Sequence, residues 1–309
     1  MEQGNLSMVA EFILLGLTES HELQIFFFVF FSITYTAIVF GNLIIILTVT
    51  FDPHLHSPMY FLLANLSLID MSLASFATPK MIHSLARKHK AISYQGYMAQ
   101  MFFLHLFGGS EMMLLVTMAI DRYIAICKPL HYATIMNHRA CFGLVLLSWT
   151  TGFMHTMSQM IFTMTLPFCG PNVVNSFFCD LPEVIKLTCL DTYVLELLVI
   201  ADSGLLSLIC FILLLISYSI ILVTMRLHSS SGSSKALSTL SAHITVVALF
   251  FGPCIFIYVW PFSSISMDKI LSVFYTIFTP LLNPIIYTFR NKDMKRSIKK
   301  LKNRVWVAV

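Results

Sequence analysis

Three consecutive residues, Asp121, Arg122 and Tyr123, stand at the end of a long apolar stretch, where that stretch would leave a lipid bilayer. An ionisable side chain in the hydrocarbon core costs roughly 2.5–3.5 kcal/mol on insertion scales. At the membrane rim the cost is smaller, and the charge can take part in an ion pair that forms in one state of the protein and breaks in another. A lone arginine there would simply snorkel toward water. The neighbouring acid favours a functional ion pair instead.

Two further acids, Asp70 and Glu111, are predicted deep inside apolar stretches, with polar candidates for neighbours at Asn42, Ser67 and Asn283. Two buried like charges cannot both stay ionised without help. Either one carboxyl is protonated in a neutral hydrogen-bonded pair, or a cation lies between the two. If they couple strongly, their titration belongs to the pair.

Hydrolytic chemistry is not indicated. His105 and His243 are bases inside predicted spans, but no Gly-x-Ser-x-Gly or His-Glu-x-x-His string accompanies them. We therefore expect that the chain is not an enzyme.

The elements that carry these residues are membrane helices. Apolar residues make up 57% of the 309-residue chain and charged residues only 11%, far from the composition of a soluble domain. A bilayer span needs roughly 20 apolar residues. Seven such spans are predicted, at about 25–49, 58–79, 98–120, 140–163, 194–223, 237–261 and 270–289. The predicted fold is an all-α, seven-helix membrane bundle.

The distribution of Lys and Arg predicts the orientation. With the N-terminus outside, 13 of the 19 basic residues fall on the cytoplasmic side, eight of them in the tail. The outer cluster Arg87, Lys88 and Lys90 opposes this bias. The expected organisation is an outer leader (1–24) with a glycosylation sequon at Asn5, a bundle (25–289) and a cytoplasmic tail (290–309). Apolar residues three to four apart in Lys292–Arg304 indicate an amphipathic helix on the inner leaflet.

Six strings in this order resemble one family. They are Gly41-Asn42, PMYFLLANLSLID (58–70), MAIDRYIAICKPLHY (118–132), Ser217-Tyr218, KALSTLSAHI (235–244) and PLLNPIIYTFRNKDMK (280–295). Together they resemble the olfactory receptors, a branch of the rhodopsin-like G-protein-coupled receptors. The resemblance covers nearly all of residues 10–300.

The resemblance implies an activation switch. In the family the arginine matching Arg122 pairs with the adjacent acid at rest and swings into the helical core on activation. Pro284 kinks the seventh span, because proline removes a backbone hydrogen bond. The tyrosine matching Tyr287 then moves inward toward the one matching Tyr218. The implied switch residues are Asp121, Arg122, Tyr123, Tyr218, Asn283, Pro284 and Tyr287. The resemblance also implies a sodium ion at Asp70 and Glu111, and no other cofactor is expected.

The implied ligand is a small, volatile, mostly apolar odorant. Its site should be a hydrophobic cavity with one or two polar groups. The positions that match the family's site lie in the outer halves of the third, fifth, sixth and seventh spans: Met101, Leu104, His105, Gly108, Gly109, Asp202, Ser203, Leu206, Phe251, Ile255, Tyr258, Val273 and Thr276. Asp202 could bind a protonated amine, or it could pair with a neighbour or face the vestibule.

The cysteines depart from the family. Members usually have a cysteine at the head of the third span, bonded to the one matching Cys179, but Tyr97 stands there. That bridge cannot form. Cys169–Cys189 remains as a pairing and would leave Cys179 unpaired. We expect weak surface expression or weak signalling from this loss.

The resulting hypothesis is an odorant receptor in the plasma membrane that activates a stimulatory G protein and raises cyclic AMP, with membrane lipid but no nucleic acid among its partners. A receptor that no longer signals, because of Tyr97, is the alternative. A transporter or channel is more remote, since the chain has no internal repeat. An opsin would need a lysine inside 270–289, which has none.

Overall fold

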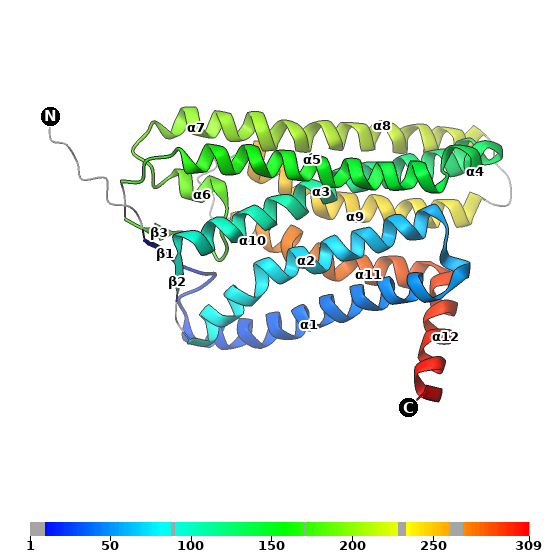
Figure 1. The fold of residues 1–309 in the computed structure, drawn as a ribbon, viewed down its shortest axis with the longest axis horizontal. Helices are drawn as coiled ribbons and strands as arrows, with labels where there is room; N and C mark the ends of the chain where they lie inside the picture. Colours follow the sequence, from blue (N-terminus) through cyan, green and yellow to red (C-terminus); the bar gives the residue numbers. More distant parts are fainter. Residues whose placement is uncertain (1–9, 88–89, 170, 228–232, 260–267, 309) are drawn as a thin grey trace.

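The computed structural model describes residues 10–87, 90–169, 171–227, 233–259 and 268–308. Within these ranges, seven long helical segments lie side by side in an elongated bundle (Figure 1). They are α1 (His21–Phe51), α2 (Pro58–Arg87), α3 (Tyr94–Cys127), α5 (His138–Met164), α7–η3–α8 (Thr192–Val199, Ile200–Gly204, Leu205–Leu227), α9 (Ser233–Val259) and α10–η4–α11 (Asp268–Val273, Phe274–Phe278, Thr279–Arg290).

Short elements join the long ones. At one end of the bundle lie η1 (Pro53–Leu55), η2 (Pro129–His131) and α4 (Tyr132–Ile135), and α12 (Lys292–Ala308) leaves that end at a steep angle (Figure 1). At the other end lie β1 (Glu11–Leu14), β2 (Ala91–Ser93), β3 (Val173–Val174) and α6 (Leu181–Ile185). Side-chain caps mark helix starts: Ser93 accepts from Gly96 N at 3.1 Å, and Asn137 accepts from Ala140 N at 3.0 Å.

The helices run beyond the predicted spans. α2 continues through Pro79 to Arg87, and α3 extends four residues earlier and seven residues later than the predicted 98–120. Arg122 therefore lies inside the last turns of a helix. In the described residues, five helical segments are long and apolar enough to cross a bilayer. α5, rich in hydroxyl and histidine side chains, and α9, with a shorter apolar part (His243–Tyr258), are not among those five.

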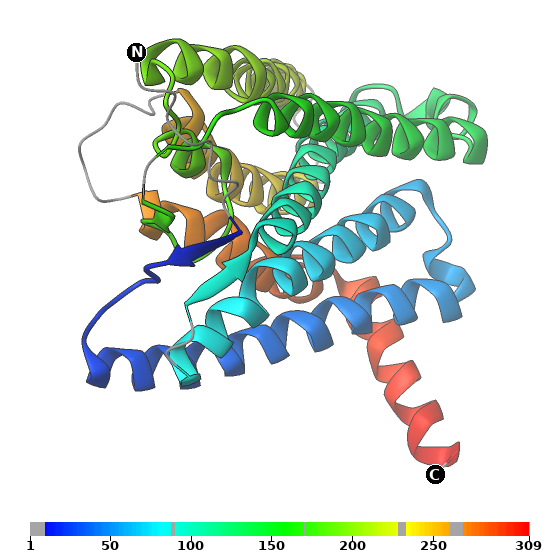
Figure 2. The ribbon, with the colours of Figure 1, turned by 60° about the vertical axis from the view of Figure 1, so that its left-hand side comes forward.

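A small sheet corrects the all-α prediction. β1 pairs antiparallel with β2, Phe12 opposite Ile92, and parallel with β3, Ile13 opposite Val173 (Figure 2). These strands are too short for the alternation that marks a strand in sequence. The predicted leader 1–24 therefore contains a strand and the first turn of α1, which begins at His21. Asn5 lies outside the described residues.

The bundle is organised around α3, which contacts α2, α5, α8 and α9. Most of its side chains are buried, including the polar His105, Ser110, Glu111 and Asp121. By contrast, α1 and α8 expose rows of large apolar side chains such as Phe40, at 61%, and Val223, at 56%. An apolar outer surface around a partly polar interior is what a lipid environment requires.

α3 and α5 cross in close backbone contact at Gly152. A Cβ added there would lie 2.6 Å from the Leu106 carbonyl oxygen and 2.7 Å from the Ser110 backbone nitrogen, and it would also collide with the Ser110 hydroxyl. Small residues at such crossings let membrane helices approach closely. Backbone atoms cannot rotate away, so the separation of the two helices depends on this glycine.

α12 is held at the end of the bundle opposite the sheet. Its Ser297 donates a hydrogen bond to the Asp52 carboxylate, as do the backbone and ring of His54, and these bonds hold the pKa of Asp52 well below its usual range. The Lys300 ammonium lies 3.7 Å from the same carboxylate. Met294 and Ser297 are buried, while Lys295 and Lys299 are exposed. The predicted amphipathic helix is thus present.

We predict that Gly152→Ala separates α3 from α5 and destabilises the receptor by about 1–3 kcal/mol, the usual cost of overpacking. Thermal unfolding of the purified receptor in detergent would measure this as a lower midpoint. Gly143→Ala on the same helix is the control, because a Cβ there meets nothing within 4 Å. Equal midpoints for the two variants would contradict the prediction.

Candidate functional site

The C-terminal end of α3 holds the predicted ion pair. The Arg122 guanidinium donates to one Asp121 oxygen through Nε, at 2.9 Å, and through a shorter bond from Nη2. On the other oxygen, the Tyr132 hydroxyl donates at 2.7 Å. Burial and this bond raise the pKa of Tyr132 well above its ordinary value, so the phenol remains a donor. The described hydrogen bonds of Arg122 go to Asp121, while Tyr123 is half-buried against the core.

Tyr132 was not singled out from the sequence, although it ends the MAIDRYIAICKPLHY string. It belongs to α4, a one-turn helix, and no periodic pattern links it to Asp121 eleven residues earlier. The contact follows from the way the chain folds back after α3.

A histidine joins the two switch tyrosines. Tyr218 of α8 is hydrogen-bonded to His243 Nδ1, and the rings of His243 and Tyr287 are 6.4 Å apart. Within the described residues, the buried His243 Nε2 and Tyr287 hydroxyl have no hydrogen-bond partner. α8, α9 and α11 therefore meet around His243. His243 was not among the switch residues predicted from the sequence, although the family string KALSTLSAHI includes it.

The two inner acids lie in contact at mid-bundle. Asp70 and Glu111 are both fully buried and close enough to share a hydrogen bond. Asn283 Nδ2 donates to Asp70 Oδ2 at 2.8 Å. Pro284 follows inside α11 and packs against Gly41, where an added Cβ would lie 3.3 Å from the proline. The predicted association of Asp70, Glu111 and Asn283 is therefore present in the fold.

Several oxygens around these acids lack partners among the described residues. They are Asp70 Oδ1, both carboxyl oxygens of Glu111, Asn42 Oδ1 and Asn283 Oδ1. Two ionised carboxylates have no proton to share, so this geometry needs either one protonated acid or a cation. Oxygen ligands suit a hard cation. Ser67 is buried one helical turn before Asp70.

A cavity lies in the half of the bundle nearest the sheet, with about 420 Å³ of space between its atoms, part of it open to solvent. Six of the predicted ligand-binding residues line it, namely Leu104, His105, Gly108, Gly109, Ser203 and Tyr258. The spacing of the four α3 residues places them on one helix face, and the two glycines leave room beside it. Seven residues that were not predicted complete the wall: Met112, His155, Phe178, Asp180, Phe250, Cys254 and Tyr275.

The other predicted ligand residues lie outside this lining. Phe251 packs against Phe211, with ring centres 5.9 Å apart, and Phe250 faces the cavity instead. Tyr275 does so in place of Val273 and Thr276, which lie before and within the π-helical segment η4. A one-residue error rotates a side chain by about 100° around a helix axis. Met101, Leu206 and Ile255 are also absent from the wall.

The polar end of the cavity centres on Asp180, in the outer loop before α6. Both its carboxylate oxygens lie 3.2 Å from the Tyr258 hydroxyl, and Oδ1 lies 3.4 Å from His105 Nε2. The backbone N–H of Leu181 donates to Oδ1 at 2.8 Å. The rest of the wall is mostly apolar. Asp180 is therefore a buried hydrogen-bond acceptor in a cavity whose wall is mostly apolar, with a second polar pair at His155 and Ser203.

Asp202 faces α5 instead of the cavity. Its carboxylate accepts hydrogen bonds from Ser158, at 2.9 Å, and from Gln159, and it lies 3.7 Å from His155 Nε2. Its side chain is 38% exposed. Of the two alternatives for this acid, pairing with neighbours is the arrangement in the fold.

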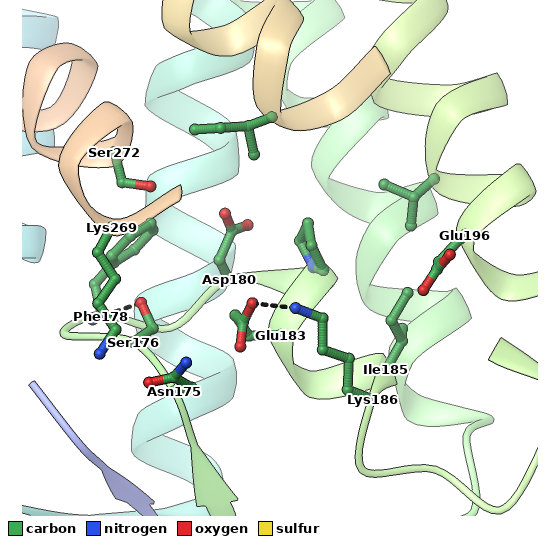
Figure 3. A pocket seen from close by; sticks show the side chains of 13 residues that line it. Asn175, Ser176, Phe178, Asp180, Glu183, Ile185, Lys186, Glu196, Lys269 and Ser272 are labelled. Atoms are coloured by element: carbon green, nitrogen blue, oxygen red, sulfur yellow. Dashed lines mark hydrogen bonds and ion pairs between the residues drawn. The ribbon is translucent and has the colours of Figure 1, made fainter. Parts of the chain in front are cut away.

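A second cavity, of about 560 Å³, lies further out (Figure 3). It is more polar, and Figure 3 shows the Glu183–Lys186 ion pair, at 2.5 Å, on its wall. Phe178 and Asp180 line both cavities. This short loop segment therefore separates an outer, charged cavity from the inner, apolar one.

The outer loop is closed by a disulfide between Cys169 and Cys189, with Cα atoms 5.3 Å apart. Cys179 is a buried free thiol, as predicted. Burial, first, and the Asp180 carboxylate, second, raise the pKa of this thiol well above its usual range. Tyr97 does not leave a void where a bridge would be: it is fully buried and hydrogen-bonded to the backbone of Asp180.

Comparison with known proteins agrees with this geometry. The family model described as "Olfactory receptor" matches residues 31–304. The chain is 66% identical to human "Olfactory receptor 4K3" over 99% of its own length and 97% of the relative's. It is 69% identical to human "Olfactory receptor 4K13" over 97% and 99%, and 63% identical to human "Olfactory receptor 4L1" over 98% and 97%.

These three matches each cover at least 97% of this chain. Such receptors are G-protein-coupled, multi-pass proteins of the plasma membrane that serve olfaction, and they are not enzymes. The chain belongs to the olfactory receptor family.

Proposed function

We propose that this receptor binds a small, mostly apolar odorant in the 420 Å³ cavity and thereby activates a stimulatory G protein that raises cyclic AMP. The observation that carries the proposal is the cavity itself. Its wall is mostly apolar, with polar groups at Asp180 and its partners and at His155 with Ser203, and an outer-loop segment borders it. Sites for small ligands are mostly apolar hollows with a few polar groups that fix orientation.

The proposed topology is seven spans with the N-terminus outside. Seven helical segments of the described chain run along the bundle, and the sheet with β1 lies at the end opposite α12 (Figure 1). The Cys169–Cys189 disulfide supports an outer location for the sheet end, because disulfides persist in oxidising compartments. The basic α12 supports a cytoplasmic location for the other end.

The wall of the cavity favours ligands that donate a hydrogen bond. The Asp180 carboxylate can only accept when ionised, and its Oδ2, which accepts from Tyr258, has a further lone pair for another donor. A ligand with only a carbonyl group would place a second acceptor beside the Asp180 carboxylate, and two acceptors cannot form a hydrogen bond with each other. An alcohol or a phenol with a compact hydrocarbon body would satisfy Asp180 and fill the apolar wall, so we propose this class of ligand.

A single helix connects the ligand to the inner switch. α9 contributes Phe250, Cys254 and Tyr258 to the cavity and, further inward, His243 to the tyrosine cluster. If the ligand binds more tightly to the conformation with α9 in one position than to the conformation with α9 in another, it shifts the population toward the first conformation. We propose that this shift rearranges Tyr218 and Tyr287 around His243 and releases Arg122 from Asp121.

The inner surface formed by this rearrangement is the proposed partner site. Segments 128–139 and 226–243 are proposed to contribute to it, and the first contains Lys128 and Arg139. Residues 228–232 of the second segment lie outside the described part of the chain. The stimulatory class of G protein is part of the proposal. The basic face of α12 is proposed to lie on anionic lipid of the inner leaflet.

We propose a sodium ion for the unpartnered oxygens around Asp70 and Glu111, with the neutral hydrogen-bonded pair as the competing arrangement. The first would be held by carboxylate and amide oxygens. The second needs no ion and leaves some of these oxygens unsatisfied.

A cyclic AMP reporter screen against a broad odorant panel, with surface labelling of an N-terminal tag, tests the function. We predict that at least one alcohol or phenol gives a concentration-dependent response. Silence across the panel at good surface levels would favour the receptor that does not signal.

For Arg122→Ala we predict a loss of agonist-driven nucleotide exchange of about 5- to 150-fold, the usual range of an allosteric coupling. The guanidinium is needed at the partner surface once Asp121 releases it. Arg87→Ala, which removes an exposed guanidinium at the other end of the bundle, is the control. Exchange that survives Arg122→Ala intact would contradict the switch.

For Asp180→Asn we predict that alcohol agonists lose about 10- to 100-fold in potency, because a hydrogen bond to a charged acceptor is lost. Ketones of the same carbon number should lose less or gain. The measurement is the ratio of the two potencies at matched surface levels. An unchanged ratio would contradict the assigned ligand class.

The sodium proposal predicts that Na⁺ raises the thermal midpoint of the purified receptor over choline at equal ionic strength. Binding to the folded state alone adds about 1.4 kcal/mol at about ten times the dissociation constant. Glu111→Gln should abolish the difference, and Asp202→Asn, outside the pair, should keep it. No sodium-specific difference in the parent would favour the neutral pair.

A further inference from the structure

Tyr97 occupies the position where relatives are expected to carry a bridging cysteine, and its contacts give it a role of its own. We propose that the Tyr97 hydroxyl anchors the outer-loop segment Phe178–Asp180 to α3 without a covalent bond, and thereby positions the Asp180 carboxylate over the ligand cavity. The part of this inference that concerns ligand response rests on the proposed function.

The anchor is a pair of hydrogen bonds to one residue. The Tyr97 hydroxyl donates to the Asp180 carbonyl oxygen at 2.8 Å, and it accepts from the Asp180 backbone N–H at 3.2 Å. A phenol can donate and accept at once, whereas a thiol does both only weakly. Both backbone polar groups of Asp180 are therefore bound to a single side chain on a rigid helix.

Gln100 extends the anchor by one helical turn. Its side-chain oxygen accepts from the Cys179 backbone N–H at 3.1 Å, and its amide nitrogen donates to the Phe76 carbonyl at 2.6 Å. Tyr97 and Gln100 are three residues apart and so lie on the same face of α3. Two consecutive loop residues, Cys179 and Asp180, are thus bound to this face.

The ring of Tyr97 is held from the opposite side. Its centre lies 4.7 Å from that of Phe12 in β1, and the side chain is fully buried. A buried tyrosine with its hydroxyl satisfied combines apolar packing with a directed hydrogen bond. Tyr97 therefore connects the N-terminal strand to the loop as well as the loop to α3.

The anchored segment forms the partition between the two cavities. Figure 3 shows the Asp180 carboxylate and Phe178 beside the outer cavity, and both residues also line the inner one. With its backbone bound to Tyr97, Asp180 directs its carboxylate toward Tyr258 and His105. Loss of the anchor would move the acceptor that the ligand is proposed to meet.

The buried Cys179 thiol reports on the anchor without any agonist. The Cys179 backbone N–H is bound to Gln100, and the next residue, Asp180, is bound to Tyr97. The thiol is 0% exposed, so a maleimide reaches it only when the segment opens. The measured quantity is the labelling rate of the purified receptor minus that of the same variant carrying Cys179→Ser. This subtraction removes the contribution of the other cysteines.

We expect Tyr97→Phe, which keeps the ring and loses both hydrogen bonds, to raise the Cys179 labelling rate about tenfold. Tyr94→Phe is the matched control. Tyr94 lies one helical turn before Tyr97, its ring contacts those of Phe12 and Phe168, and it is only partly buried. A rate that is equal in Tyr97→Phe and Tyr94→Phe would overturn the proposal, since packing alone would then hold the segment.

Two cell measurements complete the test. At matched surface levels, Tyr97→Phe should lower alcohol potency about tenfold relative to Tyr94→Phe, and an equal potency would overturn the positioning of Asp180. Surface levels of Tyr97→Cys should not exceed those of the parent, because the parent is already anchored. A clear rise would overturn the anchor and support loss of the bridge as a defect. If no agonist is found, the proposed function fails and the labelling result still decides the anchor.

Discussion

Every ionisable group that enters this bundle has to be neutralised inside it, because the outer surface faces lipid. α3 meets this constraint at three levels. His105 lies beside Asp180 and Tyr258 near the outer end, Glu111 contacts Asp70 at mid-bundle, and Arg122 pairs with Asp121 near the inner end. At the proposed ligand cavity, at the acid pair and at the proposed switch, a charged or polar side chain of α3 thus has a polar partner inside the bundle.

The outer end of the bundle is held together by contacts of several kinds. A three-stranded sheet, the Cys169–Cys189 disulfide and the Tyr97 hydrogen bonds all bind the outer loop to its surroundings. The loop in turn supplies Asp180 and Phe178 to the cavity. The wall of the proposed ligand cavity therefore depends on a segment far from α3 in sequence, and on the residues that hold it there.

Part of the candidate site could be predicted because helical spacing is visible in a sequence. Leu104, His105 and Gly108 share a face at intervals of one, three and four residues, and they line the cavity. In the seventh segment the resemblance to the family selected Val273 and Thr276, whereas Tyr275 lines the cavity. A π-helical turn changes the register locally, and the side chains around Phe274–Phe278 carry no periodic sign of it.

The sequence by itself determined the membrane class, the approximate helices and the family, because these follow from composition, apolar length and ordered motifs. It also identified Asp121, Arg122, Asp70 and Glu111, since charges within apolar spans stand out. Only the tertiary structure decided the roles of Asp180, Tyr132 and Tyr97. Their partners come from loops and from other helices, and such long-range contacts have no local pattern from which to be inferred.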